Sequence, residues 1–263
     1  MKIIIRNCNV AELDIPLKYA TKLYNEFAIR HPNAFYLRTR QRGMQNWDGK
    51  IKYITKTGQF KIGLLPSVYK RCIELGIKPI IVDMRQPLPK VSKVVTRIGK
   101  YKLRPEQEKA VKAILSNKLG ETPFQIGVLD YTVNAGKTLI MSALYLSYKK
   151  QLKTLLITND SDWLNQARDE FKQYLPGEDI TFVQGKVLNW SNFTIGMVQS
   201  ISRNMKYYQN ELAKIDMVLI DEADQGGSKQ YQNVITRLFN TRVRIGLSGT
   251  IYMSKLAKDK VKN

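Results

Sequence analysis

Short apolar runs alternate with longer amphipathic stretches through the second part of the chain. The strand-like runs are 124–129, 154–158, 193–198, 217–220 and 243–247, and the helical stretches lie near 105–118, 136–150, 162–174, 199–213 and 226–239. Strands that are apolar on both faces and separated by helices indicate a parallel sheet covered on both sides. Ligands of such sheets bind beyond the carboxyl ends of the strands, so we expect the functional residues just after each run.

The first part of the chain has a different pattern, in which strands and helices mix. Strand-like segments lie near 2–6, 35–40 and 51–55, and helical segments lie near 16–28 and 65–75. This mixture predicts a small α+β domain. A proline-containing polar stretch follows at 83–90 and is typical of a linker. We therefore expect a small domain at 1–86, a linker at 87–100 and an α/β domain at 101–263.

Charge separates the two parts further. The 263 residues carry a formal charge of +21, of which +14 falls within residues 1–100. A positive field of this size attracts phosphate polymers, although a basic surface also serves solubility. Charge alone does not distinguish DNA from RNA, so both polymers stay open. The apolar fraction of 43% excludes wholesale disorder.

Several classes of protein are excluded by what the chain lacks. No apolar run approaches the roughly 20 residues of a membrane span, and the N-terminus does not have the pattern of a signal peptide. Two cysteines and one histidine cannot supply a four-ligand zinc site or a disulfide framework. We expect a soluble, intracellular, basic protein.

The first strand of the α/β domain runs into a candidate phosphate-binding loop. Gly136-Lys137-Thr138 stands at a strand-to-helix turn, where backbone amides face phosphates, a lysine reaches the β/γ oxygens and a hydroxyl holds Mg²⁺. The position six before the lysine is Tyr131 rather than glycine, so the motif is incomplete. An ordinary helix start is the alternative interpretation. The other loop residues in this candidate site are Thr132, Asn134 and Ala135.

The strand at 217–220 runs directly into four residues, Asp221-Glu222-Ala223-Asp224. Asp221 stands where a carboxylate holds the magnesium shell, and Glu222 stands where a base orients the attacking water. A solvated acidic helix start is the alternative. A third strand end carries Ser248-Gly249-Thr250, whose hydroxyls could bridge the acidic site to a bound nucleic-acid strand.

The order of these motifs resembles that of superfamily 2 helicases, with residues 101–263 corresponding to the first RecA-like lobe. The resemblance implies that Arg104 and Gln107 contact adenine, that Lys137, Thr138 and Asp221 bind ATP and Mg²⁺, and that Glu222 polarises water. It also implies that Ser248 and Thr250 couple the ATP site to the bound nucleic-acid strand. Residues 155–160 resemble a DNA-backbone motif but carry Asn159 and Asp160 in place of the usual proline and threonine. Residues 197–200 resemble a second such motif, so Gln199 and Ser200 are candidate DNA contacts.

The first domain resembles the N-terminal domain of UvsW-type recombination helicases of T-even bacteriophages. The resemblance rests on Asn46-Trp47-Asp48-Gly49-Lys50-Ile51 and on the step Leu64-Leu65-Pro66. It implies contact with duplex or branched DNA. Alternating arginines on an extended strand would project to one side, next to an aromatic ring. The expected DNA contacts are Arg38, Arg40, Arg42, Trp47 and Lys50. The alternative is that Trp47 is core and the arginines form a solvated strand face.

The resemblance therefore implies an ATP-dependent DNA helicase or branch-migrating translocase acting in recombination, replication or repair. Such motors close two RecA-like lobes over ATP, so we expect a second lobe in cis or in trans. We also expect that the chain is a truncated helicase that hydrolyses ATP poorly alone. The alternatives are a duplex translocase without strand separation and a non-catalytic, ATP-switched DNA-binding module. The expected location is the cytoplasm, that of the host cell if a phage encodes the protein.

Overall fold

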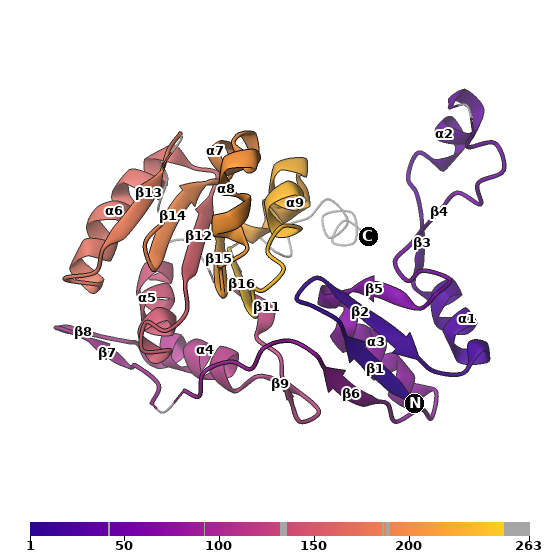
Figure 1. The fold of residues 1–263 in the computed structure, drawn as a ribbon, viewed down its shortest axis with the longest axis horizontal. Coiled ribbons are helices and arrows are strands. Elements are labelled where there is room, and N and C mark those ends of the chain that lie inside the picture. The colour runs from indigo at the N-terminus through magenta and orange to yellow at the C-terminus, as the bar shows by residue number, and fades with distance from the viewer. Residues whose placement is uncertain (42, 92, 132–135, 186, 188–189, 250–263) are drawn as a thin grey trace, which may run out of the picture. The chain divides into compact units, whose positions relative to one another are not determined.

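The computed structural model describes residues 1–263 except 42, 92, 132–135, 186, 188–189 and 250–263 (Figure 1). The chain divides into two compact units, Met1–Arg85 and Gln86–Asn263. Within the described part of the chain, the helices are all too short or too polar to cross a membrane.

The first unit is built on a four-stranded sheet with the order β5-β2-β1-β6. Its strands are β1 (Lys2–Ile5), β2 (Val10–Asp14), β5 (Gln59–Lys61) and β6 (Ile80–Asp83), and its helices are α1 (Leu17–Glu26), the short 3₁₀ turn Ile62–Leu64 and α3 (Leu65–Glu74). Strand β1 pairs antiparallel with β2 and parallel with β6. Ile3, Leu23 and Val68 are fully buried, so strands and helices share one core. This is the mixed α+β pattern that the sequence predicts.

A two-stranded ribbon, β3 (Ala28–Arg30) with β4 (Lys50–Lys52), carries the helix α2 (Ala34–Arg40). We call residues 28–53 the arm. The predicted strand at 35–40 is wrong, because this segment is helical. Residues two apart on a helix lie about 200° apart around its axis, so Arg38 and Arg40 do not project to one side. Arg42 lies outside the described residues.

The second unit contains a six-stranded, all-parallel sheet with the order β11-β16-β15-β12-β14-β13. Its strands are β11 (Ile126–Asp130), β12 (Thr154–Thr158), β13 (Ile180–Val183), β14 (Phe193–Met197), β15 (Met217–Asp221) and β16 (Val243–Ser248). The predicted α/β class is confirmed. Only β13 was not among the predicted strands of this sheet.

Helices cover both faces of this sheet, as the doubly apolar strands predict (Figure 1). Leu156 of β12 packs in one cluster with residues of α4, α5 and α6, whereas Leu155 packs in a second cluster with residues of α7, α8 and α9. The helices are α4 (Pro105–Ser116), α5 (Lys137–Ser147), α6 (Ser161–Tyr174), α7 (Val198–Arg203), α8 (Met205–Leu212) and α9 (Lys229–Ile235). The helix predicted at 199–213 is therefore two helices, separated at Asn204.

The predicted linker segment also contributes to this unit. Leu88 and Val94 pack against the larger core cluster. Gln86, predicted as the last residue of the first domain, also belongs to this unit, and its carbonyl accepts a hydrogen bond from Arg242. Four short strands form two hairpins, β7 (Arg97–Ile98) with β8 (Tyr101–Lys102) and β9 (Lys118–Leu119) with β10 (Thr122–Pro123).

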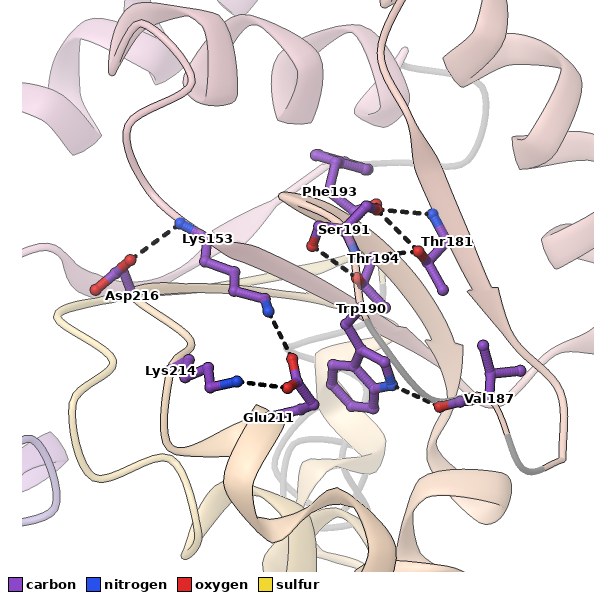
Figure 2. A network of polar contacts seen from close by, with 10 residues as sticks. All are labelled: Lys153, Thr181, Val187, Trp190, Ser191, Phe193, Thr194, Glu211, Lys214 and Asp216. Carbon is purple, nitrogen blue, oxygen red and sulfur yellow. Dashed lines mark hydrogen bonds and ion pairs between the residues drawn. The ribbon is translucent and has the colours of Figure 1, made fainter.

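The amino-terminal edge of the sheet is held by a polar network that surrounds Lys153, just before β12 (Figure 2). Its ammonium donates to Glu211 of α8 at 2.6 Å, and its backbone amide donates to Asp216 at 3.0 Å. Lys214 donates to the same glutamate at 2.7 Å. The network fastens α8 and the start of β15 to β12. It occupies the amino-terminal edge, whereas ligands of parallel sheets bind at the carboxyl edge.

Candidate functional site

The phosphate-loop candidate ends where α5 begins. Gly136 is the N-cap of α5 and has a φ of +76°, a left-handed conformation that glycine adopts without steric cost. Lys137 and Thr138 then form the first turn of the helix, whose amides point toward any bound anion. Thr132, Asn134 and Ala135 lie outside the described residues.

The structure brings Lys137 and Asp221 together. The ammonium nitrogen of Lys137 lies 3.8 Å from Oδ1 of Asp221, although the two residues are on separate elements and far apart in the chain. Asp221 ends β15 and is 4% exposed. Burial raises the pKa of its carboxyl group, while the charge of Lys137 opposes that rise. Oδ1 is buried and has no hydrogen-bond partner in the described structure.

Glu222 follows directly in a left-handed backbone conformation, with a φ of +52°. A non-glycine residue in this region costs about 1–2 kcal/mol. Such strain is found at functional sites, where the surrounding structure holds it in place. The turn starts the 3₁₀ segment Ala223–Gly227, and Tyr231 of α9 supports it by donating to the carbonyl of Asp221 at 3.4 Å.

Gln107 and Gly136 are in close approach. Oε1 of Gln107 accepts the backbone amide of Arg104 at 2.9 Å, and the side chain is 3% exposed. A Cβ atom added to Gly136 would lie 2.4 Å from Nε2 of Gln107. The predicted adenine-contacting segment therefore adjoins the start of α5.

The third strand end meets the second through a side-chain hydrogen bond. Oγ of Ser248 donates to Oδ1 of Asp224 at 2.8 Å, and Ser248 is 1% exposed. Thr250 lies outside the described residues. Asp224 had no role of its own in the sequence-based prediction, although it stands in the same acidic run.

Gly246 of β16 was also missed. A Cβ atom added there would lie 2.5 Å from Cβ of Ala223, so the strand and the acidic turn approach more closely than a side chain allows. A glycine inside a predicted strand is the signal that could have revealed this approach.

A hydrogen bond joins the two candidate DNA-backbone motifs. Nε2 of Gln199, in α7, donates to the carbonyl of Asn159 at 3.2 Å. The next residue, Asp160, is the N-cap of α6 and accepts the amides of Asp162 and Trp163. Asp160, which stands where the resemblance implies a threonine, therefore caps α6. Ser200 lies within the first turn of α7.

In the first unit, the candidate DNA contacts share the arm but have different surroundings. Arg38 and Lys50 line a cavity of about 230 Å³. The guanidinium of Arg40 lies 4.7 Å from the ring centre of Tyr36. The indole of Trp47 is partly buried and donates to the carbonyl of Lys50 at 3.0 Å.

ATP with Mg²⁺ fits the residues at the carboxyl edge. The buried Oδ1 of Asp221 accepts no hydrogen bond and faces a lysine that would bind phosphate, and Thr138 presents a hydroxyl in the first turn of α5. Within the described ranges, no group of three or more His, Cys, Asp or Glu residues could hold a metal ion. The carboxylate of Asp221 and the hydroxyl of Thr138 suit Mg²⁺, which binds through one or two protein ligands together with phosphate oxygens and water.

Comparison with known proteins adds a family and relatives. Residues 100–253 match the family model described as the type III restriction enzyme Res subunit. The ATP-dependent DNA helicase UvsW of Enterobacteria phage T4 is 24% identical over 227 residues, which are 78% of this chain and 43% of the relative. A protein of Acanthamoeba polyphaga mimivirus that carries the provisional name of an ATP-dependent RNA helicase is 26% identical over 123 residues, which are 46% of this chain and 23% of the relative. The chain thus spans less than half of each of these curated relatives.

Solved structures show the same fold over nearly the whole chain. A crystal structure of the UvsW helicase from bacteriophage T4 matches with a TM-score of 0.73 and 20% identity, covering 99% of this chain and 97% of that one. A second crystal structure of T4 UvsW matches with a TM-score of 0.74 and 22% identity, covering 97% of this chain and 54% of that one.

Proposed function

The chain belongs to the family of the type III restriction enzyme Res subunit, whose model covers more than half of its length, and from this premise we propose that it is the nucleotide-binding part of an ATP-dependent DNA motor. The motor is a superfamily 2 helicase or branch-migrating translocase that acts in recombination, replication or repair. The name of the phage T4 relative, an ATP-dependent DNA helicase, supports this choice.

One observation carries the proposal, namely the distance of 3.8 Å between Lys137 and Asp221. A phosphate-binding lysine and a magnesium-binding carboxylate must lie together to act on one nucleotide. Both stand at the carboxyl edge of a parallel sheet, where ligands of such folds bind.

Each residue of the site has a role in the proposal. Lys137 binds phosphate oxygens, Thr138 and Asp221 hold the metal, and Glu222 orients the attacking water. Arg104 and Gln107 contact the adenine. Bound Mg²⁺ neutralises charge on the phosphates. Ser248 and Asp224 link the acidic turn to β16, the last strand of this sheet in chain order. This link would transmit a shift of the acidic turn on nucleotide binding to the residues that contact nucleic acid.

The proposed partners are DNA and a second RecA-like lobe, in cis or in trans. The first 100 residues carry two thirds of the net charge, which suits a nucleic-acid surface. An arginine from a second lobe would accelerate turnover by about 10³–10⁵-fold, so the chain alone should bind ATP well and hydrolyse it slowly.

The test is a titration with a fluorescent ATP analogue and Mg²⁺, together with single-turnover hydrolysis in the presence of DNA. Lys137→Ala should weaken nucleotide binding at least about tenfold, because it removes the cation that faces the phosphates. Glu222→Gln should retain binding and lose hydrolysis. Lys172→Ala, at an exposed lysine near the end of α6, is the matched control and should change neither measurement.

Two results would decide against the proposal. If Lys137→Ala binds the nucleotide as tightly as the unchanged chain, the nucleotide does not bind at the start of α5. If Glu222→Gln hydrolyses ATP as fast as the unchanged chain, Glu222 does not orient the attacking water.

A further inference from the structure

The tip of the arm exposes aromatic rings between cations. Phe35 is 79% exposed and Tyr36 is 54% exposed, and both belong to α2. Exposed rings on a water-facing helix forfeit the stabilisation that burial would give them, so a cluster of them marks a binding surface. We infer that Phe35 and Tyr36 form a stacking surface for unpaired nucleobases, and that the arm thereby selects branched or single-stranded DNA. The inference rests on the proposed DNA function and adds the form of DNA that this unit recognises.

Cations surround these rings. Residues 28–53 contain six lysines and arginines and one acidic residue, Asp48. That carboxylate accepts the amide of Lys50 at 2.9 Å and lies 3.3 Å from the ammonium of Lys52. These contacts hold its pKa below the ordinary value, so it stays ionised and committed to the arm. The remaining charge of the arm is positive and suits a phosphate polymer.

The cavity beside Phe35 provides a place for a backbone phosphate. Arg30, Arg38 and Lys50 line it together with Phe35 and Asp48, and its volume is about 230 Å³. Asp48 is the one acidic residue of this lining, and its charge is offset by Lys52 at 3.3 Å, so the three cations leave the cavity positive. A phosphate held by these cations would place the adjoining base next to the exposed ring. The second ring already has a cation over its face, because Arg40 lies 4.7 Å from the centre of Tyr36 and donates to its hydroxyl at 3.1 Å. Such pairs of arginine and aromatic ring are suited to stacking on bases.

Contacts within the arm hold α2 in place before any DNA arrives. The amide of His31 donates to the carbonyl of Gly49 at 2.8 Å. Gly49 has a φ of +76°, and a Cβ atom added there would lie 3.0 Å from Cβ of Ala34, so the helix packs closely on this turn. Trp47 packs edge-on against His31 and donates to Lys50, which makes it a support of the arm. Figure 1 shows α2 at the end of the β3–β4 ribbon.

Stacking on these rings distinguishes one form of DNA from another. In an intact duplex the face of every internal base is covered by its neighbours, so an external ring finds no partner. At a fork, a gap or a single strand, base faces are free, and stacking on an aromatic side chain strengthens binding by about tenfold per base. Phosphate contacts by the arginines act on both forms alike.

The experiment compares the full chain and its variants on a plain duplex and on a fork of the same length, with 2-aminopurine at the first unpaired position. Phe35→Leu keeps apolar bulk but removes the ring, and Phe35→Tyr keeps the ring. Phe239→Ala, a phenylalanine of the second unit that is 46% exposed, is the matched control. Circular dichroism confirms that each variant is folded.

We expect Phe35→Leu to lose about tenfold in affinity for the fork and to abolish the 2-aminopurine response, with duplex affinity unchanged. Phe35→Tyr and Phe239→Ala should behave as the unchanged chain. Arg38→Ala should weaken both DNA forms and reduce the slope of log affinity against log salt by about one, whereas Phe35→Leu should leave that slope unaltered.

The inference is overturned if Phe35→Leu binds the fork as tightly as the unchanged chain, or if it loses the same factor on duplex and fork. The outcome for the proposed function is separate. If the unchanged chain binds neither DNA, the DNA role itself fails, whereas binding of both DNAs with no effect of Phe35→Leu overturns only the stacking surface.

Discussion

Oγ of Ser248 and Oδ1 of Asp224 are joined by a hydrogen bond of 2.8 Å. The serine ends β16, and the aspartate lies in the turn that follows Asp221 and Glu222. Because Ser248 is 1% exposed, water does not compete effectively for its hydroxyl. A shift of the acidic turn on nucleotide binding would therefore pull on the last strand of the sheet.

Ser248→Ala should separate nucleotide binding from its effect on DNA binding. The change removes the hydroxyl at a residue that is not among those proposed to bind ATP. ATP-analogue affinity should stay within about twofold, while the ratio of DNA affinities with and without the analogue should fall by about fivefold or more. Fluorescence anisotropy with labelled DNA measures this ratio. Ser116→Ala, at an exposed serine of α4, is the control, and an unchanged ratio in Ser248→Ala would refute the link.

Gly136→Ala should weaken nucleotide binding for a different reason. The φ of +76° is unfavourable for alanine by about 1–2 kcal/mol, and its methyl group would meet Nε2 of Gln107 at 2.4 Å. We expect at least about a tenfold loss of ATP-analogue affinity, because both the loop and the adenine-contacting side chain must move. Gly127→Ala is the matched control, since an added Cβ there meets nothing within 4 Å. Equal affinities for the two variants would argue against the close approach.

The α/β unit could be predicted from sequence because its strands are buried on both faces. Residues 154–158 are apolar or small at every position, and all five are buried, so the run could be recognised without any partner strand. The joining of Lys137 and Asp221 followed from the rule that parallel strands end at the same edge. The contact between Ser248 and Asp224 could not be predicted, because sequence does not give the rotamers that bring two side chains together.

The arm was misread because its helix buries almost nothing. In α2 only Ala34 is buried, so no helical period of apolar residues marks the segment. Leu37, Arg38, Thr39 and Arg40 instead alternate between apolar or β-branched residues and arginine, which mimics a strand. The helix is set by local contacts, such as the hydroxyl of Thr39 bonding the carbonyl of Phe35 at 3.1 Å, and by the packing of Ala34 on Gly49.

Glu211→Gln should destabilise the second unit at neutral pH. Burial raises the pKa of this carboxyl group, but hydrogen bonds from Lys153 and Lys214 outweigh burial and leave it below its ordinary value (Figure 2). A lowered folded-state pKa contributes stability above the unfolded-state pKa, and that stability is lost as the pH falls through the folded-state pKa. We expect a loss of about 1 kcal/mol at pH 7.

Thermal unfolding followed from pH 7 downward measures this loss, which should shrink below about pH 4.5. Glu121→Gln, at a fully exposed glutamate, is the control and should leave unfolding unchanged. A loss that is the same at every pH would contradict the electrostatic explanation.

Asp216→Asn should stabilise the second unit at neutral pH, although Asp216 lies in the same network as Glu211. Burial raises the pKa of this carboxyl group, and the amide and charge of Lys153 only partly oppose the rise. With the folded-state pKa above that of the unfolded chain, the folded protein binds the proton more tightly, so stability is greatest in acid and declines as the pH rises through the folded-state pKa.

Asparagine keeps a carbonyl oxygen that can accept the amide of Lys153 but carries no charge to bury. The variant should therefore unfold at a higher temperature than the unchanged chain at pH 7, and the two should converge as the pH falls below the ordinary aspartate pKa of about 3.9, where the folded and the unfolded chain both bind the proton. Because Glu211 and Asp216 contact the same lysine, a general weakening of the network would lower stability in both variants. Opposite signs at pH 7 would show that desolvation decides the behaviour of Asp216 and hydrogen bonding that of Glu211, whereas a loss in both variants would refute this division.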